Sequence, residues 1–263
     1  MEKREKTAEH PRLGALVLER RHSQKEAVGI LITGGVVALL SAVGTIFGGQ
    51  SGPVAGIFGG ITTVAVLVFG IVKLIAARTA YLVYERGLVE ESGGRSIEVP
   101  YTELVEITFD AVRVKHKVVS KTHYKLKLLA EDGFLITMAD DDKFRVIGST
   151  GQATRVKQIA MIVAQGVANI LLERVRAGEE VQWVRGARLT PAGLANGRGV
   201  VVPWRAVGSL RMENGYFWVC RAGSEAAVVQ GESSDANFLP GWAFLEQMAE
   251  RVRAEAAQAL QST

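Results

Sequence analysis

The chain has 263 residues, a formal net charge of +4, 29 glycines and a single cysteine. Residues 27–72 contain no Asp, Glu, Lys, Arg or His, and a wholly soluble domain does not readily absorb so long an uncharged run. Cys220 stands alone, which excludes a disulfide framework and a cysteine-based metal site. A net charge of +4 is also far smaller than the basic surplus that is typical of nucleic-acid-binding proteins.

The N-terminal segment, residues 1–26, combines a polar start with a short apolar run. Leucine or valine occupies positions 13 and 16–18, and Arg20-Arg21 follows soon after. This pattern leaves two interpretations open. The segment is either a short element packed against the folded domains or a helix that lies at the membrane interface.

The uncharged stretch predicts a two-helix transmembrane hairpin over residues 27–77. Turn-forming residues at 48–53 divide it into two apolar segments, 27–47 and 54–76. At 1.5 Å rise per residue each segment is about 30 Å long, which is the thickness of a bilayer's hydrocarbon core. Lys and Arg flank both outer ends and are absent from the connecting turn. The positive-inside rule therefore predicts a multi-pass protein with both termini in the cytoplasm.

Glycines recur at four-residue intervals around the predicted turn. They are Gly44, Gly48, Gly52, Gly56 and Gly60. Small residues one helical turn apart allow two helix backbones to approach closely, so this spacing indicates that the two helices pack on each other. Homo-oligomerisation through the same faces is the alternative.

From residue 78 onward the periodicity is that of short strands followed by a helix. Strands are expected at residues 80–84, 88–90, 96–99, 104–109 and 134–138, with a long alternating stretch at 112–129. Asp132-Gly133 predicts a hairpin turn before the last strand. Apolar side chains at three- and four-residue spacing predict a helix over 152–175. Residues 78–178 are therefore expected to form an α+β domain.

The same plan recurs in residues 179–261. The matching motifs are Gly87-Leu88 followed by Val99-Pro100-Tyr101, and Gly193-Leu194 followed by Val202-Pro203-Trp204. Asn214-Gly215 predicts a type I′ turn in a second hairpin, and a second helix is expected over 238–260. Repetition on this scale predicts a duplication. The aromatic residue after each proline is then expected to be buried.

Strand meanders with Gly-Leu and Pro-aromatic motifs, each closed by an amphipathic helix, resemble the bacterial pleckstrin-homology-like (PH-like) domains. The resemblance covers about residues 78–261, and such domains commonly sit beside transmembrane hairpins in bacterial membrane proteins. It implies an α+β fold of two tandem PH-like domains, each with bent antiparallel sheets capped by a C-terminal helix, next to a transmembrane α-helical hairpin. It also implies a location in the bacterial inner membrane and a role in binding or assembly.

The long alternating stretch carries cations at odd-numbered positions. They are Arg113, Lys115, Lys117, Lys121, Lys125 and Lys127. Because alternate residues of a strand point to the same side, this pattern predicts one basic face that binds anionic lipid headgroups or a protein partner. The alternative is a solvated face whose lysines protect a sheet edge from aggregation. On that predicted face no aromatic residues interleave with these cations, which disfavours nucleic acid as the ligand.

No motif in the sequence predicts catalysis. The phosphate-binding loop, the nucleophile elbow and the His-Glu-x-x-His zinc signature are all missing from it, and no cofactor or metal is expected. The sequence therefore predicts a non-enzymatic, inner-membrane-anchored scaffold whose tandem domains bind anionic lipid or a protein partner. The alternative is an accessory subunit of a larger membrane complex, docked through the glycine-rich transmembrane hairpin.

Overall fold

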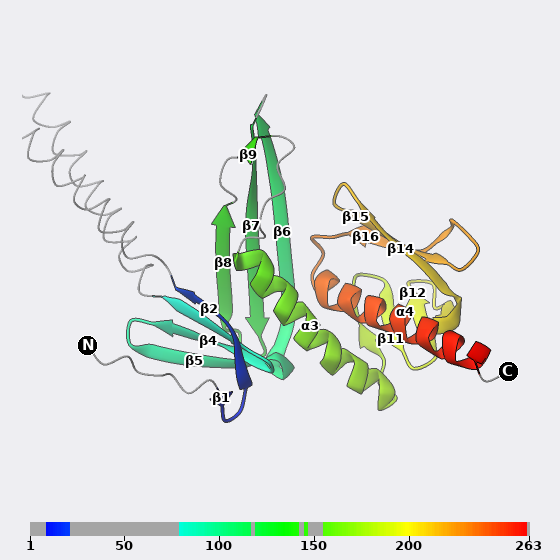
Figure 1. Cartoon of the computed structure of the whole chain (residues 1–263), viewed down its shortest axis with the longest axis horizontal. Coiled ribbons are helices and arrows are strands. Elements are labelled where there is room, and N and C mark those ends of the chain that lie inside the picture. The colour runs from blue at the N-terminus through cyan, green and yellow to red at the C-terminus, as the bar shows by residue number, and fades with distance from the viewer. Residues whose placement is uncertain (1–8, 22–78, 117–118, 142–144, 147–154, 262–263) are drawn as a thin grey trace, which may run out of the picture. The chain divides into compact units, whose positions relative to one another are not determined.

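The computed structural model describes residues 9–21, 79–116, 119–141, 145–146 and 155–261 (Figure 1). This part of the chain contains four antiparallel sheets and two long helices, which confirms the predicted mixture of strands and helices. Both predicted transmembrane segments lie outside the described residues, as do Gly44, Gly48, Gly52, Gly56 and Gly60. The chain divides into two compact units, one of residues 16–84 and 88–98 and the other of residues 1–15, 85–87 and 99–263.

The first sheet has five strands in the order β1-β2-β3-β4-β5. The strands are β1 Glu9–His10, β2 Gly14–Arg21, β3 Ala80–Tyr84, β4 Gly87–Ser92 and β5 Arg95–Pro100. The apolar run of the N-terminal segment is β2, which pairs with the fully buried β3 from Leu16 opposite Tyr84 to Arg21 opposite Ala80. Of the two interpretations of this segment, the packed element is therefore confirmed for residues 14–21.

The second sheet and the first long helix follow. They comprise β6 Leu104–His116, β7 Val119–Ala130, β8 Leu135–Asp141, the short β9 Arg145–Val146 paired with β7, and α3 Arg155–Arg176. A single 3₁₀ turn, Tyr101–Glu103, joins β5 to β6. The predicted turn at Asp132-Gly133 is confirmed, because Gly133 has φ +83° and Asp132 Oδ1 accepts a hydrogen bond from the Phe134 N–H at 2.9 Å.

The succession of sheet, 3₁₀ turn, three-stranded meander and long helix then recurs. Its elements are β10 Val181–Gln182, β11 Ala187–Thr190, β12 Gly193–Asn196, β13 Val201–Pro203, the 3₁₀ turn Trp204–Ala206, β14 Val207–Glu213, β15 Tyr216–Arg221, β16 Ala227–Glu232 and α4 Phe238–Gln261. Asn214 has φ 51° and Gly215 has φ 84°, as a type I′ turn requires. We call the elements through α3 the first copy and those from β10 to α4 the second copy.

The Gly-Leu and Val-Pro motifs have the same physical role in both copies. Each glycine begins a strand at the point where the backbone of the following Val-Pro segment lies directly beside it. A Cβ added at Gly87 would lie 2.8 Å from the Val99 carbonyl oxygen, and one added at Gly193 would lie 2.8 Å from Pro203 Cα. Only a residue without a side chain allows this approach, which explains why the motif marks the repeat.

The aromatic residues after the prolines occupy equivalent positions but differ in burial. Tyr101 and Trp204 each begin the 3₁₀ turn of their copy. Tyr101 is 2% exposed and packs against α3 at Gly166, where any side chain would meet its ring. Trp204 is half-buried, with its ring centroid 5.5 Å from that of Phe244 and its Nε1–H donating to the Thr190 carbonyl at 3.2 Å. The expected burial is therefore complete in the first copy and partial in the second.

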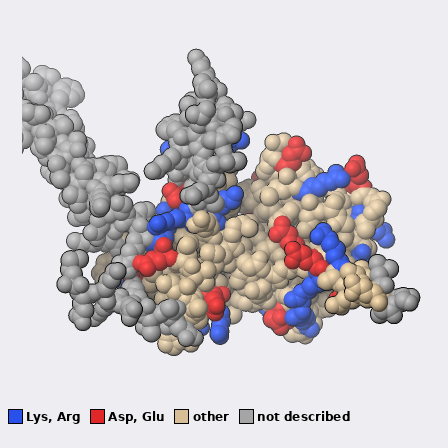
Figure 2. Space-filling model, viewed as in Figure 1, with Lys and Arg blue, Asp and Glu red and all other residues tan. Residues whose placement is uncertain are grey.

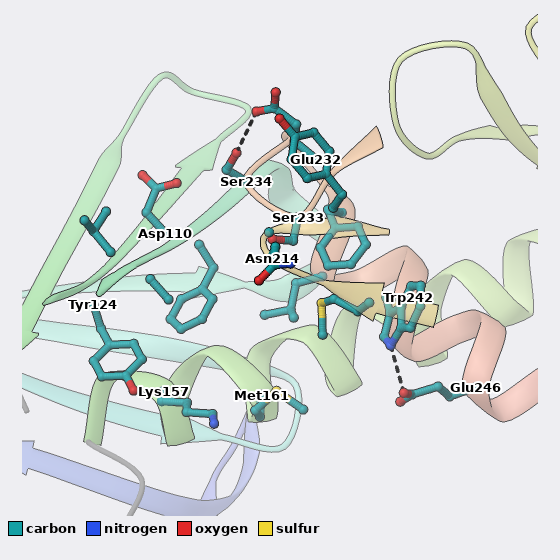
Figure 3. Close-up of a pocket in the computed structure, with 18 residues that line it drawn as sticks. Asp110, Tyr124, Lys157, Met161, Asn214, Glu232, Ser233, Ser234, Trp242 and Glu246 are labelled. Carbon is teal, nitrogen blue, oxygen red and sulfur yellow. Dashed lines mark hydrogen bonds between the residues drawn. The ribbon is translucent and has the colours of Figure 1, made fainter. Parts of the chain in front are cut away.

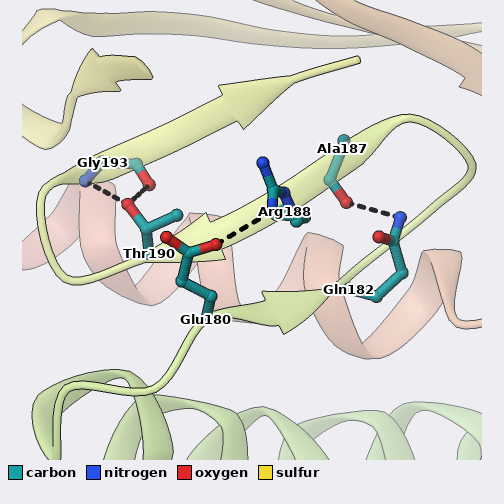
Figure 4. Close-up of polar contacts among 6 residues, drawn as sticks. All are labelled: Glu180, Gln182, Ala187, Arg188, Thr190 and Gly193. Atoms are coloured by element: carbon teal, nitrogen blue, oxygen red, sulfur yellow. Dashed lines mark hydrogen bonds and ion pairs between the residues drawn. The ribbon is translucent and has the colours of Figure 1, made fainter. Parts of the chain in front are cut away.

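Side-chain hydrogen bonds close the turns of the second copy's first sheet (Figure 4). The Thr190 hydroxyl donates to the Gly193 carbonyl at 2.8 Å and accepts from the Gly193 N–H at 3.1 Å. The Gln182 amide donates to the Ala187 carbonyl at 2.9 Å, and Arg188 pairs with Glu180 at 3.0 Å. These groups satisfy one another, so we assign them to the stability of the sheet rather than to a binding site.

The helix α3 joins the two copies. It packs against β7, β8 and the first 3₁₀ turn, while Ala168, Leu172 and Val175 belong to the second copy's core together with Phe217 and Phe244. Among the described residues, α3 is the one helix that is long and apolar enough to cross a membrane, and 44% of its apolar window is buried. Such burial is also typical of a helix in the core of a folded domain, which is the role that its contacts give it here.

Candidate binding groove

The cations of the first hairpin do not share one face. In the pairing of β6 with β7, Asp110 lies opposite Lys125 and Arg113 lies opposite Thr122. Residues that are directly opposite in an antiparallel pair point to the same side of the sheet. Odd-numbered residues of β6 therefore share a face with even-numbered residues of β7, and Arg113 lies on the other face from Lys121, Lys125 and Lys127. The prediction of a single basic face was wrong.

The error has a simple geometrical cause. The prediction carried the odd–even alternation unchanged through the turn. However, His116 pairs directly with Val119, so the connection has two residues, and this exchanges the two faces. Lys115 is on β6 opposite Ser120, whereas Lys117 lies outside the described residues.

Three lysines of β7 still share a face, but they share it with a carboxylate. Lys121, Lys125 and Lys127 are separated by even numbers of residues on one strand, and Asp110 is directly opposite Lys125. Figure 2 shows Lys and Arg side chains interspersed with Asp and Glu over the visible part of the described surface. The three lysines therefore lie on a face that also carries the Asp110 carboxylate.

A groove of about 730 Å³ lies between β6 and the second copy (Figure 3). This volume is within the range of protein ligand-binding sites. Residues 109–112 of β6 form one wall, and the turn of the second hairpin, with Met212 and Tyr216, forms the other. Met161 of α3 and Trp242 of α4 lie along the base. All of these residues belong to the same compact unit.

The groove is mainly apolar, with an excess of acidic groups. Asp110, Glu232 and Glu246 contribute carboxylates, while Lys157 contributes the one ammonium group among its lining residues. Glu246 accepts a hydrogen bond from Trp242 Nε1–H at 2.8 Å, which holds its carboxylate at the end of the groove. Three carboxylates against one cation give the groove a negative potential that favours basic ligands.

Asn237, at the start of α4, fixes the second copy to the edge of β6. The Ile107 N–H donates to Asn237 Oδ1 at 2.9 Å, and the Asn237 N–H donates to the Ile107 carbonyl at 2.8 Å. Asn237 Nδ2–H also donates to the Val105 carbonyl at 3.0 Å. Asn237 has φ 61°, a left-handed conformation that asparagine tolerates better than most residues. This one residue therefore imitates a neighbouring strand and positions the groove next to it.

The pKa shifts of the described residues belong to packed tyrosines, one carboxyl and the Arg211 guanidinium, all outside the groove. Burial raises the pKa of Tyr101 above its usual value, and burial with the charge of Glu90 raises the pKa of Tyr81. Desolvation also raises the pKa of Glu90 itself. Within the described residues, no group of three His, Cys, Asp or Glu side chains is arranged to hold a metal ion.

Sequence reasoning missed the groove because its walls come from segments about 100 residues apart. One feature of the sequence could have indicated the groove, namely the greater length of the first hairpin. This length extends β6 beyond Ile107, the residue to which Asn237 is hydrogen-bonded. No family model, curated protein or solved structure matches the chain. The similarity to bacterial PH-like domains therefore stays a prediction from the sequence motifs.

Proposed function

We propose that this chain is a non-enzymatic scaffold, anchored in the bacterial inner membrane by residues 27–77, whose tandem PH-like domains bind a protein partner. The observation that carries the proposal is the groove between β6 and the second copy. Apolar side chains such as Met212 and Tyr216 are about half exposed there, at 57% and 51%, on strands that are held by a well-packed core. Exposed apolar residues gathered in one hollow mark an interaction surface.

The repeated order of elements supports the assignment of two PH-like domains. Each copy has a small antiparallel sheet, a 3₁₀ turn, a three-stranded meander and a long C-terminal helix. The same glycine-to-backbone approach occurs in both, at Gly87 and at Gly193. Two copies of a binding fold joined through one helix create a groove that neither copy has alone.

Site-specific photo-cross-linking in native membranes tests the proposal. A photoreactive amino acid at Met212 is expected to give a discrete protein adduct, because this side chain lines the groove. The control position is Val200, which is 55% exposed and does not line the groove. The same adduct from both positions, or adducts with lipid alone, would contradict a protein-binding groove.

Anionic lipid is a second candidate ligand, which the common face of Lys121, Lys125 and Lys127 favours. If these lysines bind the inner leaflet, changing all three to Glu should abolish binding to anionic vesicles, and added salt should weaken it because the charges are screened. Arg113→Glu is the matched control, because Arg113 lies on the other face. Equal binding to neutral vesicles would exclude this candidate.

Two further experiments test the anchor and its alternative. A reporter that is active only outside the cytoplasm should be silent when fused at either terminus and active when inserted at residues 49–52. Purification in mild detergent tests the alternative role as an accessory subunit. A foreign protein at fixed stoichiometry that is lost when Gly48 and Gly56 are changed to Leu would support docking through the transmembrane hairpin.

A further inference from the structure

We infer that the outer edge of β6 within the groove is a strand-addition site for an extended partner segment in which basic and apolar side chains alternate. This inference rests on the proposed protein-binding function and deepens it. It names the backbone groups that bind the partner, and it names the partner's chemistry.

The direction of the β6 backbone groups follows from Asn237. Both the N–H and the C=O of Ile107 bond to Asn237, so they point away from β7. In an antiparallel ladder, the residues whose N–H and C=O point to a given side alternate along the strand. The pairing of β6 with β7 is regular from Glu106 to His116. The N–H and C=O groups of Phe109 and Ala111 therefore also point away from β7.

Phe109 and Ala111 are the positions where this edge enters the groove. Residues 109–112 line it consecutively, a stretch of about 14 Å at the usual rise of a strand. β6 has β7 as its one strand neighbour in the described sheet, and the contacts of Asn237 end at Ile107. An edge of this kind is a template for another strand, unless the protein covers it or blunts it.

The side chains around this edge define what the added strand should carry. Residues of an incoming strand opposite Phe109 and Ala111 would share their face, where the Phe109 ring stacks on Tyr124 with centroids 6.0 Å apart. That face favours apolar side chains. Residues opposite Asp110 and Val112 would lie on the other face, next to the Asp110 carboxylate.

At the edge itself charge complementarity favours basic side chains for that second set, because Asp110 lies on the edge strand, whereas Lys121, Lys125 and Lys127 of the same face lie one strand away on β7. Lys125 is opposite Asp110 on the β7 side, so the incoming strand approaches the carboxylate from the other side. Glu232 and Glu246 add two more carboxylates to the groove, against Lys157. A strand of alternating basic and apolar residues therefore satisfies both the backbone edge and the charges of the groove.

The direct test measures binding of defined peptides to the full chain in detergent. The probe is a fluorescent heptapeptide of alternating lysine and valine, compared with its glutamate–valine counterpart by fluorescence anisotropy. We expect the lysine peptide to bind at least about tenfold more tightly. A third peptide is N-methylated at the residues that face the β6 edge, and it should bind about tenfold more weakly than the unmodified lysine peptide. Equal binding of the lysine and glutamate peptides would overturn the inference.

Proline substitution tests the edge without disturbing the ladder. Ala111→Pro removes an N–H that points away from β7, a position where edge strands tolerate proline. It should abolish preference for the lysine peptide while the circular dichroism spectrum and melting temperature stay close to those of the wild type. Ala111→Val keeps the N–H and should bind as the wild type does. If Ala111→Pro unfolds the chain, Asp110→Lys takes its place as the test and should reverse the preference between the two peptides.

The outcomes separate this inference from the function on which it rests. A groove adduct from Met212 together with peptide binding that Ala111→Pro leaves unchanged would retain protein binding and overturn strand addition. Loss of both the adduct and the peptide binding would overturn both. A wild-type dimer that becomes monomeric in Ala111→Pro would show that a second copy of this chain occupies the edge, and would overturn the proposed basic partner.

Discussion

The two copies follow one plan but differ in the length of their central hairpin. β6 and β7 have 13 and 12 residues, whereas β14 and β15 have 7 and 6. The shorter hairpin ends at Asn214-Gly215, and its turn forms one wall of the groove. The longer one extends past Asn237 and supplies the opposite wall. The repeated order of sheet, turn, meander and helix stabilises both copies in the same way, whereas the difference in hairpin length produces the candidate site between them.

The aromatic residues that begin the 3₁₀ turns give the largest expected contrast between the copies. Tyr101→Ala should lower the free energy of unfolding by about 4 kcal/mol, because it empties a fully buried site against α3. Trp204→Ala should cost about 2 kcal/mol, because that ring is only half-buried. Urea unfolding of the full chain in detergent measures both. Equal losses would contradict the difference in packing.

Adding a single methyl group at the glycine of the repeat motif should destabilise the chain. Gly87→Ala and Gly193→Ala should each destabilise the chain by about 3 kcal/mol, because the new Cβ overlaps the Val-Pro backbone of the next strand. Gly199→Ala is a matched control. Nothing lies within 4 Å of its added Cβ, so only the left-handed backbone conformation costs energy, about 1 kcal/mol. If Gly199→Ala lowered the free energy of unfolding as much as the two motif substitutions do, close backbone approach would not explain the repeated glycine.

The contact between the copies at Asn237 should have a smaller effect on stability. Asn237→Ala removes two side-chain hydrogen bonds to β6 and should cost about 2 kcal/mol. It also frees the Ile107 N–H, although the backbone N–H of residue 237 still faces the Ile107 carbonyl, so binding of the lysine–valine peptide should be kept or increased. Weaker peptide binding at unchanged stability would mean that Asn237 contacts the ligand rather than the edge.

The pH dependence of stability gives the smallest expected effect. The pKa of Tyr101 is raised in the folded state, so above pH 10 the unfolded chain loses this proton while the folded chain keeps it. Stability should therefore be complete below pH 10 and fall by about 1.4 kcal/mol per pH unit above it, as the pH rises toward the folded pKa. In Tyr101→Phe this contribution to the alkaline slope should disappear. Unfolding free energies at pH 9, 10 and 11 test it, and an unchanged slope would contradict the burial of the hydroxyl.

Local patterns predicted the elements well. β3 occupies the expected residues 80–84, α3 and α4 begin and end within three residues of the predicted helices, and the turn at Asn214-Gly215 has the expected conformation. These features depend on periodicity and on residues with special backbone preferences, which neighbouring residues largely determine. The sequence did not decide whether the segment that forms β2 is a packed element or an interfacial helix, because its partner strand β3 lies about 60 residues away.

The candidate site could not be predicted in the same way. The placement of the six cations depended on the exact number of residues in one turn, and an error of one residue exchanges the faces of the strand. The groove depends on Asn237 meeting β6 across about 130 residues of sequence, which no local pattern encodes. The sequence indicated that the two hairpins differ in length. It did not indicate that this difference leaves a groove between β6 and the second hairpin, because that depends on how the two copies pack.

Hydrogen exchange at individual amides of β6 tests the central claim most directly. The amides of Asp110 and Val112 face β7 and should exchange slowly, while those of Phe109 and Ala111 should exchange at least about tenfold faster in the free protein. Saturation with the lysine–valine peptide should slow Phe109 and Ala111 to the rates of their neighbours and leave Asp110 and Val112 unchanged. Protected amides at Phe109 and Ala111 in the free protein, or exchange that the bound peptide leaves unaltered, would contradict a free strand edge in the groove.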